Sequence, residues 1–150
     1  MTAKPRYLLD LNIVLDFLQR REPWVSAARG LFEAERQERV DLYVSADAIS
    51  TLFYQARKAL PATKAALMIE LLLQRLRIAD VTGAVLQRAF RLGLPDLEDA
   101  IQAAAALEAG IGVLVSRDAK DFKGLTDLQV LSPDIALAAL QLERPQGPMA

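Results

Sequence analysis

Short apolar segments alternate with longer helical stretches along almost the whole of this 150-residue chain. The segments expected to form strands are residues 6–10, 41–44, 77–79, 112–116 and 128–131. Helices are expected between them, over residues 13–20, 23–39, 45–60, 62–76, 82–93, 97–109 and 133–142. Strands that alternate with helices form parallel sheets covered on both faces. We therefore predict a three-layer α/β/α sandwich with a short parallel sheet.

The chain is expected to form a single domain over residues 1–150, with 143–150 as a flexible tail. No linker, repeat or low-complexity segment divides it. No apolar run reaches the length of a membrane span, and the N-terminus lacks the pattern of a signal peptide. We expect a soluble, cytoplasmic protein that does not bind a membrane.

The absence of cysteine and histidine narrows the chemistry. It excludes disulfides, thiolate nucleophiles, Ser-His-Asp triads and most zinc sites. Any catalysis must use carboxylates, hydroxyls, amines or a hard metal ion. The net charge of −1 provides no global positive field for nucleic acid. Binding to a polyanion would need local basic patches or bridging metal ions.

Acidic residues fall at or near the carboxyl ends of two expected strands. Asp10 ends the first strand, and Asp118 follows the fourth by two residues. Asp99 lies in the first turn of the helix that leads into that fourth strand, and Asp96 and Asp121 lie three residues from Asp99 and Asp118. Ligand sites in open α/β sheets form outside these strand ends.

Carboxylates that lie close together repel one another, and a bound cation stabilises the group. Mg²⁺ or Mn²⁺ suits oxygen ligands, and such an ion can activate water and neutralise a phosphodiester. The alternative is a local structural role. Asp96 and Asp118 are suited to capping helices, and Asp10 could be a turn residue. Spacing alone leaves both interpretations open.

Three segments resemble, in order and spacing, the motifs of the PIN domain family. Residues 8–16 resemble its opening Leu-Asp-Thr-Asn-Val-Leu-Leu-Asp motif, and residues 97–106 resemble its central Asp-Ala-hydrophobic helix. Residues 113–122 resemble its Val-Thr-Arg-Asn/Asp-x-x-Asp-Phe segment. The resemblance extends from about residue 6 to residue 142 and implies a PIN-like fold.

The resemblance also implies a Mg²⁺- or Mn²⁺-dependent ribonuclease site. It assigns catalytic acids and metal ligands to Asp10, Asp99 and Asp118, accessory acids to Asp121 and Asp96, and supporting roles to Asn12 and Ser116. Many small bacterial PIN proteins are VapC-like toxins, which a small antitoxin holds inactive and which are often homodimers. The implied partners are therefore RNA, an antitoxin and a second copy of the chain.

Two positions depart from the family pattern. Thr51 stands where a Glu is usual, and Leu11 stands where Thr or Ser is usual. A hydroxyl cannot replace the negative charge of the Glu, so metal affinity should fall. The alternative function is therefore a weakened PIN-fold module that binds RNA or a protein without turnover. A receiver-type phosphate-transfer protein is disfavoured because no glycine-rich phosphate loop is present.

The remaining predictions concern basic, acidic and apolar residues outside the predicted metal site. Arg117 and Lys120, beside Asp118, are candidate RNA phosphate contacts, with ordinary solvated surface as the alternative. The remaining expectations are structural: Asp16 and Glu98 as solvated surface acids, Asp47 as a helix cap, and Trp24 as a packing residue. Apolar faces over residues 52–60 and 67–72 are expected to be mostly core, with some surface left for a dimer contact or a partner helix.

Overall fold

The fold is taken from a computed structural model, which describes residues 3–142. The elements are β1 (Arg6–Leu9), α1 (Leu11–Gln19), α2 (Val25–Arg36), β2 (Asp41–Ser45), α3 (Ala48–Arg57), α4 (Ala62–Leu73), β3 (Arg77–Ala79), α5 (Gly83–Arg91), α6 (Leu97–Glu108), β4 (Val113–Val115), the 3₁₀ helix η1 (Ala119–Phe122), β5 (Gln129–Leu131) and α7 (Pro133–Leu142). The expected tail at 143–150 lies outside the described residues.

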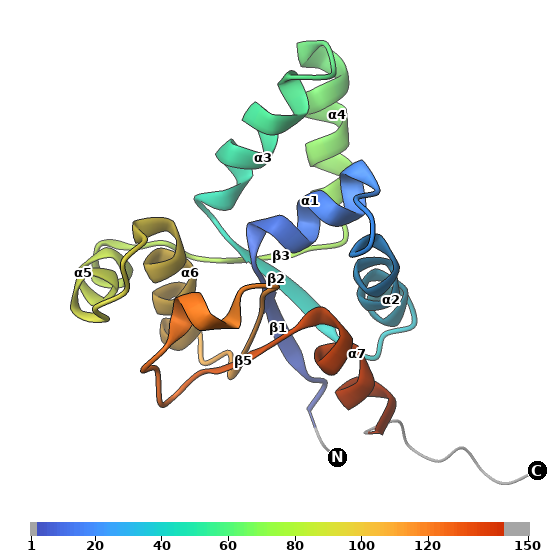
Figure 1. Ribbon diagram of the computed structural model, residues 1–150. Helices are drawn as coiled ribbons and strands as arrows, with labels where there is room; N and C mark the ends of the chain where they lie inside the picture. Colours follow the sequence, from blue (N-terminus) through green and yellow to red (C-terminus); the bar gives the residue numbers. More distant parts are fainter. Residues whose placement is uncertain (1–2, 143–150) are drawn as a thin grey trace, which may run out of the picture.

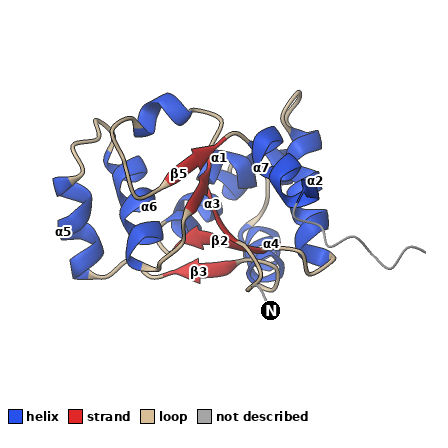
Figure 2. Cartoon of the chain, turned by 90° about the horizontal axis from the view of Figure 1, so that it is seen from below, coloured by secondary structure: helices blue, strands red, loops and turns tan. Residues whose placement is uncertain are grey.

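The strands form one parallel sheet in the order β3-β2-β1-β4-β5. Helices α5 and α6 cover one face, and α1, α2 and α7 cover the other (Figures 1 and 2). The predicted three-layer α/β/α sandwich is confirmed. From β1 the chain builds outward through β2 to β3, and β4 and β5 are added on the opposite side of β1. The strand order thus reverses at the β1–β4 pair, which is where ligands bind in sheets of this kind.

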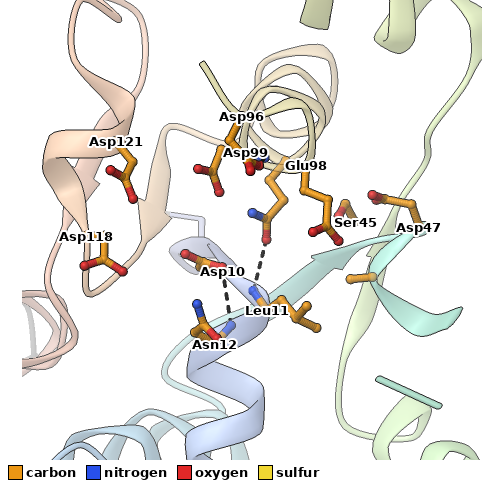
Figure 3. A pocket seen from close by; sticks show the side chains of 12 residues that line it. Asp10, Leu11, Asn12, Ser45, Asp47, Asp96, Glu98, Asp99, Asp118 and Asp121 are labelled. Carbon is orange, nitrogen blue, oxygen red and sulfur yellow. Dashed lines mark hydrogen bonds between the residues drawn. The ribbon is translucent and has the colours of Figure 1, made fainter. Parts of the chain in front are cut away.

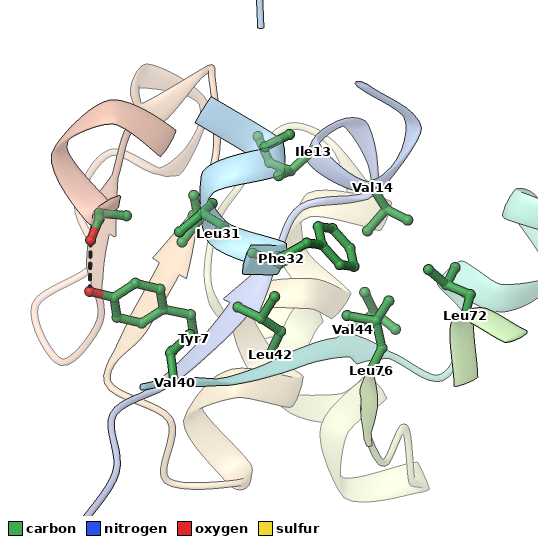
Figure 4. Close-up of a cluster of buried hydrophobic side chains, with 14 of the residues drawn as sticks. Tyr7, Ile13, Val14, Leu31, Phe32, Val40, Leu42, Val44, Leu72 and Leu76 are labelled. Atoms are coloured by element: carbon green, nitrogen blue, oxygen red, sulfur yellow. Dashed lines mark hydrogen bonds between the residues drawn. The ribbon is translucent and has the colours of Figure 1, made fainter. Parts of the chain in front are cut away.

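Hydrophobic side chains fill both interlayer spaces. On the α1–α2–α7 side, Phe32 lies among buried aliphatic residues (Figure 4). Its ring stacks on that of Phe17, with 3.9 Å between the ring centroids. Tyr7 belongs to the same cluster, and its hydroxyl donates a hydrogen bond to the carbonyl of Ala136 at 3.0 Å. On the other side, the buried alanines 103–106 of α6 lie against the sheet. Such small side chains allow close packing, which fixes the position of α6 and of the acids at its start.

The helix starts agree in part with the sequence-based expectation. Asp10 caps α1, because its carboxylate accepts a hydrogen bond from the backbone N–H of Asn12. Asp47 was expected to cap α3, but it makes no such hydrogen bond. The capping role suggested for Asp96 is confirmed for α6, and Thr82 caps α5. Across residues 3–142, no helix has both the length and the apolar character of a bilayer span.

Candidate metal centre

A polar pocket of about 230 Å³ lies at the carboxyl ends of the central strands (Figure 3). Its lining comes from the start of α1, the turn between β2 and α3, the start of α6 and the segment after β4. The residues are Asp10, Leu11, Asn12, Ser45, Asp47, Ala48, Asp96, Glu98, Asp99, Gln102, Asp118 and Asp121. All five aspartates predicted as ligands, and Asn12, therefore meet at one cavity although they are far apart in the sequence.

Asp10 is the central and most deeply placed of these acids. It follows β1 directly and its side chain is buried, with 6% of the residue exposed. The hydroxyl of Ser116 donates a hydrogen bond to Asp10 Oδ2 at 2.8 Å, and the N–H of Asn12 donates to Oδ1 at 3.3 Å. The Ser116 oxygen in turn accepts a hydrogen bond from the Asp118 N–H at 3.1 Å. Ser116 does not line the pocket, but it joins the backbone of Asp118 to the carboxylate of Asp10.

The first turn of α6 brings Asp96 and Asp99 to the opposite wall. Asp96 Oδ1 accepts a hydrogen bond from the Asp99 N–H at 2.9 Å, so Asp96 caps the helix and also lines the pocket. For Asp96, capping of the helix and a position at the predicted metal site are therefore compatible. Asp118 precedes η1 without a side-chain capping bond, so the capping alternative for Asp118 is wrong.

The acids of the pocket raise one another's pKa. The pKa of Asp99 is raised to about 7. Burial is the largest cause, and the nearby carboxylates contribute the rest, in the order Asp96, Asp10, Asp121 and Glu98. Burial also raises the pKa of Asp10, against hydrogen bonds led by that of Ser116, and the charge of Asp118 adds a smaller upward contribution. The negative charges are therefore poorly compensated by the protein itself.

The donors fit a divalent cation that keeps part of its water shell. As the side chains stand, no three His, Cys, Asp or Glu residues within 3–142 are grouped closely enough to hold an ion directly. The cavity is larger than a bare ion, and Mg²⁺ commonly retains several waters between itself and carboxylates. Two buried oxygens beside the cavity, Ser45 Oγ and Asp47 Oδ1, lack a hydrogen-bond partner. Such oxygens call for a donor or a cation.

Two lining residues were missed or misjudged from the sequence. Gln102 is buried in α6, and its Oε1 accepts a hydrogen bond from the N–H of Leu11 at 3.0 Å, which ties α6 to the start of α1. In the sequence, the feature that could have indicated this role is the position of Gln102, a polar residue directly before a run of alanines. Glu98, expected to be a solvated surface acid, is exposed but lines the pocket. Its carboxylate lies 3.5 Å from the hydroxyl of Thr51, the residue that replaces the usual Glu.

A second charged group lies behind the pocket. Asp16 was expected to be a solvated surface acid, which is wrong because it has no exposed surface. The Arg117 Nε lies 3.0 Å from Asp16 Oδ2, and the Arg117 guanidinium lies 3.8 Å from the ring centroid of Trp24. Trp24 is 41% exposed. Arg117 is thus held on both sides, whereas the other predicted RNA contact, Lys120, is exposed on η1.

A model of the PIN domain matches residues 6–120. The chain belongs to the PIN domain family. No curated protein matches this PIN domain closely. Among solved structures it is similar to VapBC-1 from nontypeable Haemophilus influenzae, with 21% identity, a TM-score of 0.67, and coverage of 86% of this chain and 98% of the other. It is similar to a toxin–antitoxin complex from Klebsiella pneumoniae, with 22% identity, a TM-score of 0.63, and coverage of 85% and 97%.

A third similar structure is VapC20 from Mycobacterium tuberculosis, which is described as a toxin that cleaves the sarcin-ricin loop. The identity is 13%, the TM-score is 0.61, and the match covers 82% of this PIN domain and 98% of VapC20. At these identities the three matches establish a shared fold. Together with the family match they confirm the VapC-like resemblance in fold.

Proposed function

We propose that this PIN domain is a metal-dependent endoribonuclease of the VapC toxin type, which hydrolyses RNA phosphodiester bonds. One observation carries the proposal: six aspartates from four distant segments, among them the five predicted ligands, line a single pocket where the strand order reverses. A histidine-free, cysteine-free chain has few other ways to activate water. The fold shared with VapC20, whose described activity is cleavage of an RNA loop, supports this choice of substrate.

In this proposal Asp10, Asp99 and Asp118 are the catalytic ligands of a Mg²⁺ or Mn²⁺ ion, with Asp96 and Asp121 as accessory ligands. When bound, the ion would activate water and neutralise charge on the phosphate. Asp10 is held for this role by Ser116, which also fixes the backbone of Asp118. Asn12, on the pocket wall, would orient a ligand or a water molecule.

Thr51 motivates a second candidate function, a weakened module that binds RNA or protein without turnover. Thr51 approaches the pocket only through its contact with Glu98 at 3.5 Å. Glu98 is therefore the acid placed to supply the charge that the usual Glu would bring. If Glu98 does not act as a metal ligand, the metal affinity of the pocket should be low. The protein would then be better described as a binding module than as a nuclease.

RNA would reach the pocket along η1. Lys120 is exposed there and lies two residues from Asp118, which suits a contact to the phosphate backbone. The neighbouring Arg117 already pairs with Asp16, so most of the electrostatic attraction of RNA falls to Lys120 and to the bound ion.

We also propose that a small antitoxin protein is a partner, in line with the toxin–antitoxin complexes that share this fold. An apolar groove of about 370 Å³ runs between α1, α2 and α4. Two of its leucines, Leu67 and Leu71, are more than half exposed, at 55% and 53%. Arg75 lines the groove but already pairs with Glu35, whereas the exposed Lys64 on its wall suits an apolar helix face that carries an acidic residue. A homodimer remains a prediction from the family resemblance.

The decisive experiment is cleavage of a structured RNA with Mn²⁺, with and without chelator. We expect cleavage by the wild type that chelator, Asp10→Asn and Asp99→Asn each abolish. Asp134→Asn is the matched control, because Asp134 is an exposed acid on α7 that does not line the pocket. Cleavage that survives chelator and both pocket variants would refute the proposal. An inactive wild type that becomes active on Thr51→Glu would instead support the binding module.

A further inference from the structure

Two separate sets of contacts hold the segment that follows β4. In the first, Ser116 donates a hydrogen bond to Asp10 at 2.8 Å and accepts one from the N–H of Asp118 at 3.1 Å. In the second, the side chain of Arg117 reaches Asp16 of α1 and the ring of Trp24. Arg117 therefore contacts α1 and the residue just before α2, while its two neighbours belong to the hydrogen-bond network around Asp10.

Asp16 is an unusual partner for a surface loop. It has no exposed area, and it lies 3.0 Å from Arg117 Nε and 3.9 Å from a terminal nitrogen of Arg21. Neither of its carboxylate oxygens has a hydrogen-bond partner of good geometry within residues 3–142. The pairing is therefore held by charge rather than by directed hydrogen bonds.

A buried ion pair of this kind is weak evidence for stability, because desolvation of both charges offsets their attraction. Packed hydrophobic residues in the same space often give a folded state of equal or greater stability. In some proteins, buried charges are retained because they fix one geometry among several. In this chain the pair lies immediately before Asp118 in the sequence, because Arg117 is its basic member.

We propose that Arg117 is a positioning residue: the buried carboxylate of Asp16 and the ring of Trp24 hold it from behind, and it thereby orients Asp118 in the metal pocket. This inference rests on the proposed function for its importance to metal binding. It gives Arg117 a different task from an RNA contact, since the guanidinium is already engaged and the Arg117 side chain is only 18% exposed. The partly exposed ring of Trp24 packs against the guanidinium of Arg117.

The first test measures Mn²⁺ binding by titration calorimetry in wild type, Arg117→Met, Asp16→Asn and Trp24→Leu. Removal of a residue that orients a metal ligand typically weakens binding about 10- to 100-fold, and we expect that range for Arg117→Met and Asp16→Asn. Lys123→Met is the matched control, because it removes the same charge from an exposed position nearby and should leave Mn²⁺ affinity unchanged. Unchanged affinity in Arg117→Met with weaker RNA binding would overturn the proposal and make Arg117 an RNA contact.

The second test uses amide hydrogen exchange of the metal-free protein and does not depend on metal binding. Loss of the Arg117 contacts should speed exchange over residues 116–122 while exchange in β1 and β2 stays as in the wild type. Trp24→Leu decides the matter if Asp16→Asn fails to fold, because the exposed Trp24 lies outside the core. Exchange over 116–122 that is unchanged in both Trp24→Leu and Arg117→Met would overturn the inference. If the wild type binds no Mn²⁺ yet exchange responds as expected, the proposed function fails and the positioning role stands.

Discussion

Replacement of Asp99 by Asn should stabilise the metal-free protein at neutral and alkaline pH while it removes metal binding. The pKa of Asp99 is raised to about 7, mainly by burial and then by Asp96 and Asp10. A raised pKa means that the folded state binds the proton more tightly than the unfolded state does. Ionisation of Asp99 therefore costs folding free energy, and this cost grows as pH rises from about 4 to about 7. Asn has the same shape and carries no charge, so the cost disappears.

The size of the effect follows from the pKa. A rise from 3.8 to about 7 corresponds to an upper limit of roughly 4 kcal/mol at about 1.4 kcal/mol per pKa unit. Asp99 is only half-buried, so solvent screening reduces this figure, and we expect a gain of about 2 kcal/mol at pH 8. The same linkage leaves less than about 1 kcal/mol at pH 5, where the folded wild type is mostly protonated at this site. At pH 8, where Asp99 is ionised, loss of a favourable helix-dipole interaction at the start of α6 subtracts about 0.3–1 kcal/mol from this gain.

Urea denaturation in chelator, at pH 8 and at pH 5, measures this prediction. Asp134→Asn is the control, because Asp134 lies in the first turn of α7 and loses the dipole interaction without relief from neighbouring carboxylates. Saturating Mn²⁺ should stabilise the wild type by about 2.7 kcal/mol at a hundredfold excess over Kd, and should not stabilise Asp99→Asn. A variant less stable than the wild type at pH 8, or a gain of equal size at both pH values, would refute the electrostatic reasoning.

Three further predictions concern the pocket and the groove. Thr51→Glu should raise Mn²⁺ affinity in calorimetry, because it restores a carboxylate beside Glu98; equal or weaker binding would mean that Glu98 already fills that place. Gln102→Leu should lower the free energy of unfolding by about 1–3 kcal/mol in urea denaturation, since the buried N–H of Leu11 loses its acceptor; an unchanged midpoint would contradict this. Leu71→Asp should weaken, in a co-purification assay, the complex with the proposed antitoxin partner and leave RNA cleavage by the free protein unchanged; undiminished binding would place the partner elsewhere.

The sequence sufficed to predict the sheet and the convergence of the acids because both depend on local signals. A strand followed at once by an acid places that acid at a sheet edge, and parallel strands share that edge. The sequence alone therefore predicts that Asp10 and Asp118 lie close together, and it places Asp99 beside them through the helix that leads into β4. The roles of these residues as ligands remain predictions, since proximity does not measure binding.

The sequence did not reveal the polar residues whose partners lie far along the chain. Asp16 sits one residue after buried Leu15 and pairs with Arg117, about a hundred positions away, so no local pattern marks it as buried. Gln102 accepts its hydrogen bond from Leu11, an equally distant residue. The sequence shows only that Asp16 and Gln102 are each a polar residue within an otherwise apolar stretch of helix. Such a residue needs a buried partner, but only the folded topology identifies it.

The distribution of ion pairs gives an independent reason to expect a cation in the pocket. Elsewhere in residues 3–142, five of the eleven acids lie within 4.0 Å of a basic side chain, as Glu35 does with Arg75 and Glu108 with Arg88. Even the buried Asp16 has Arg117 and Arg21 beside it. In contrast, seven carboxylate residues line the pocket, and none of them has an ion-pair partner among the described residues. Uncompensated carboxylates at this density raise the free energy of the folded state, which supports the proposed divalent ion as the compensating charge.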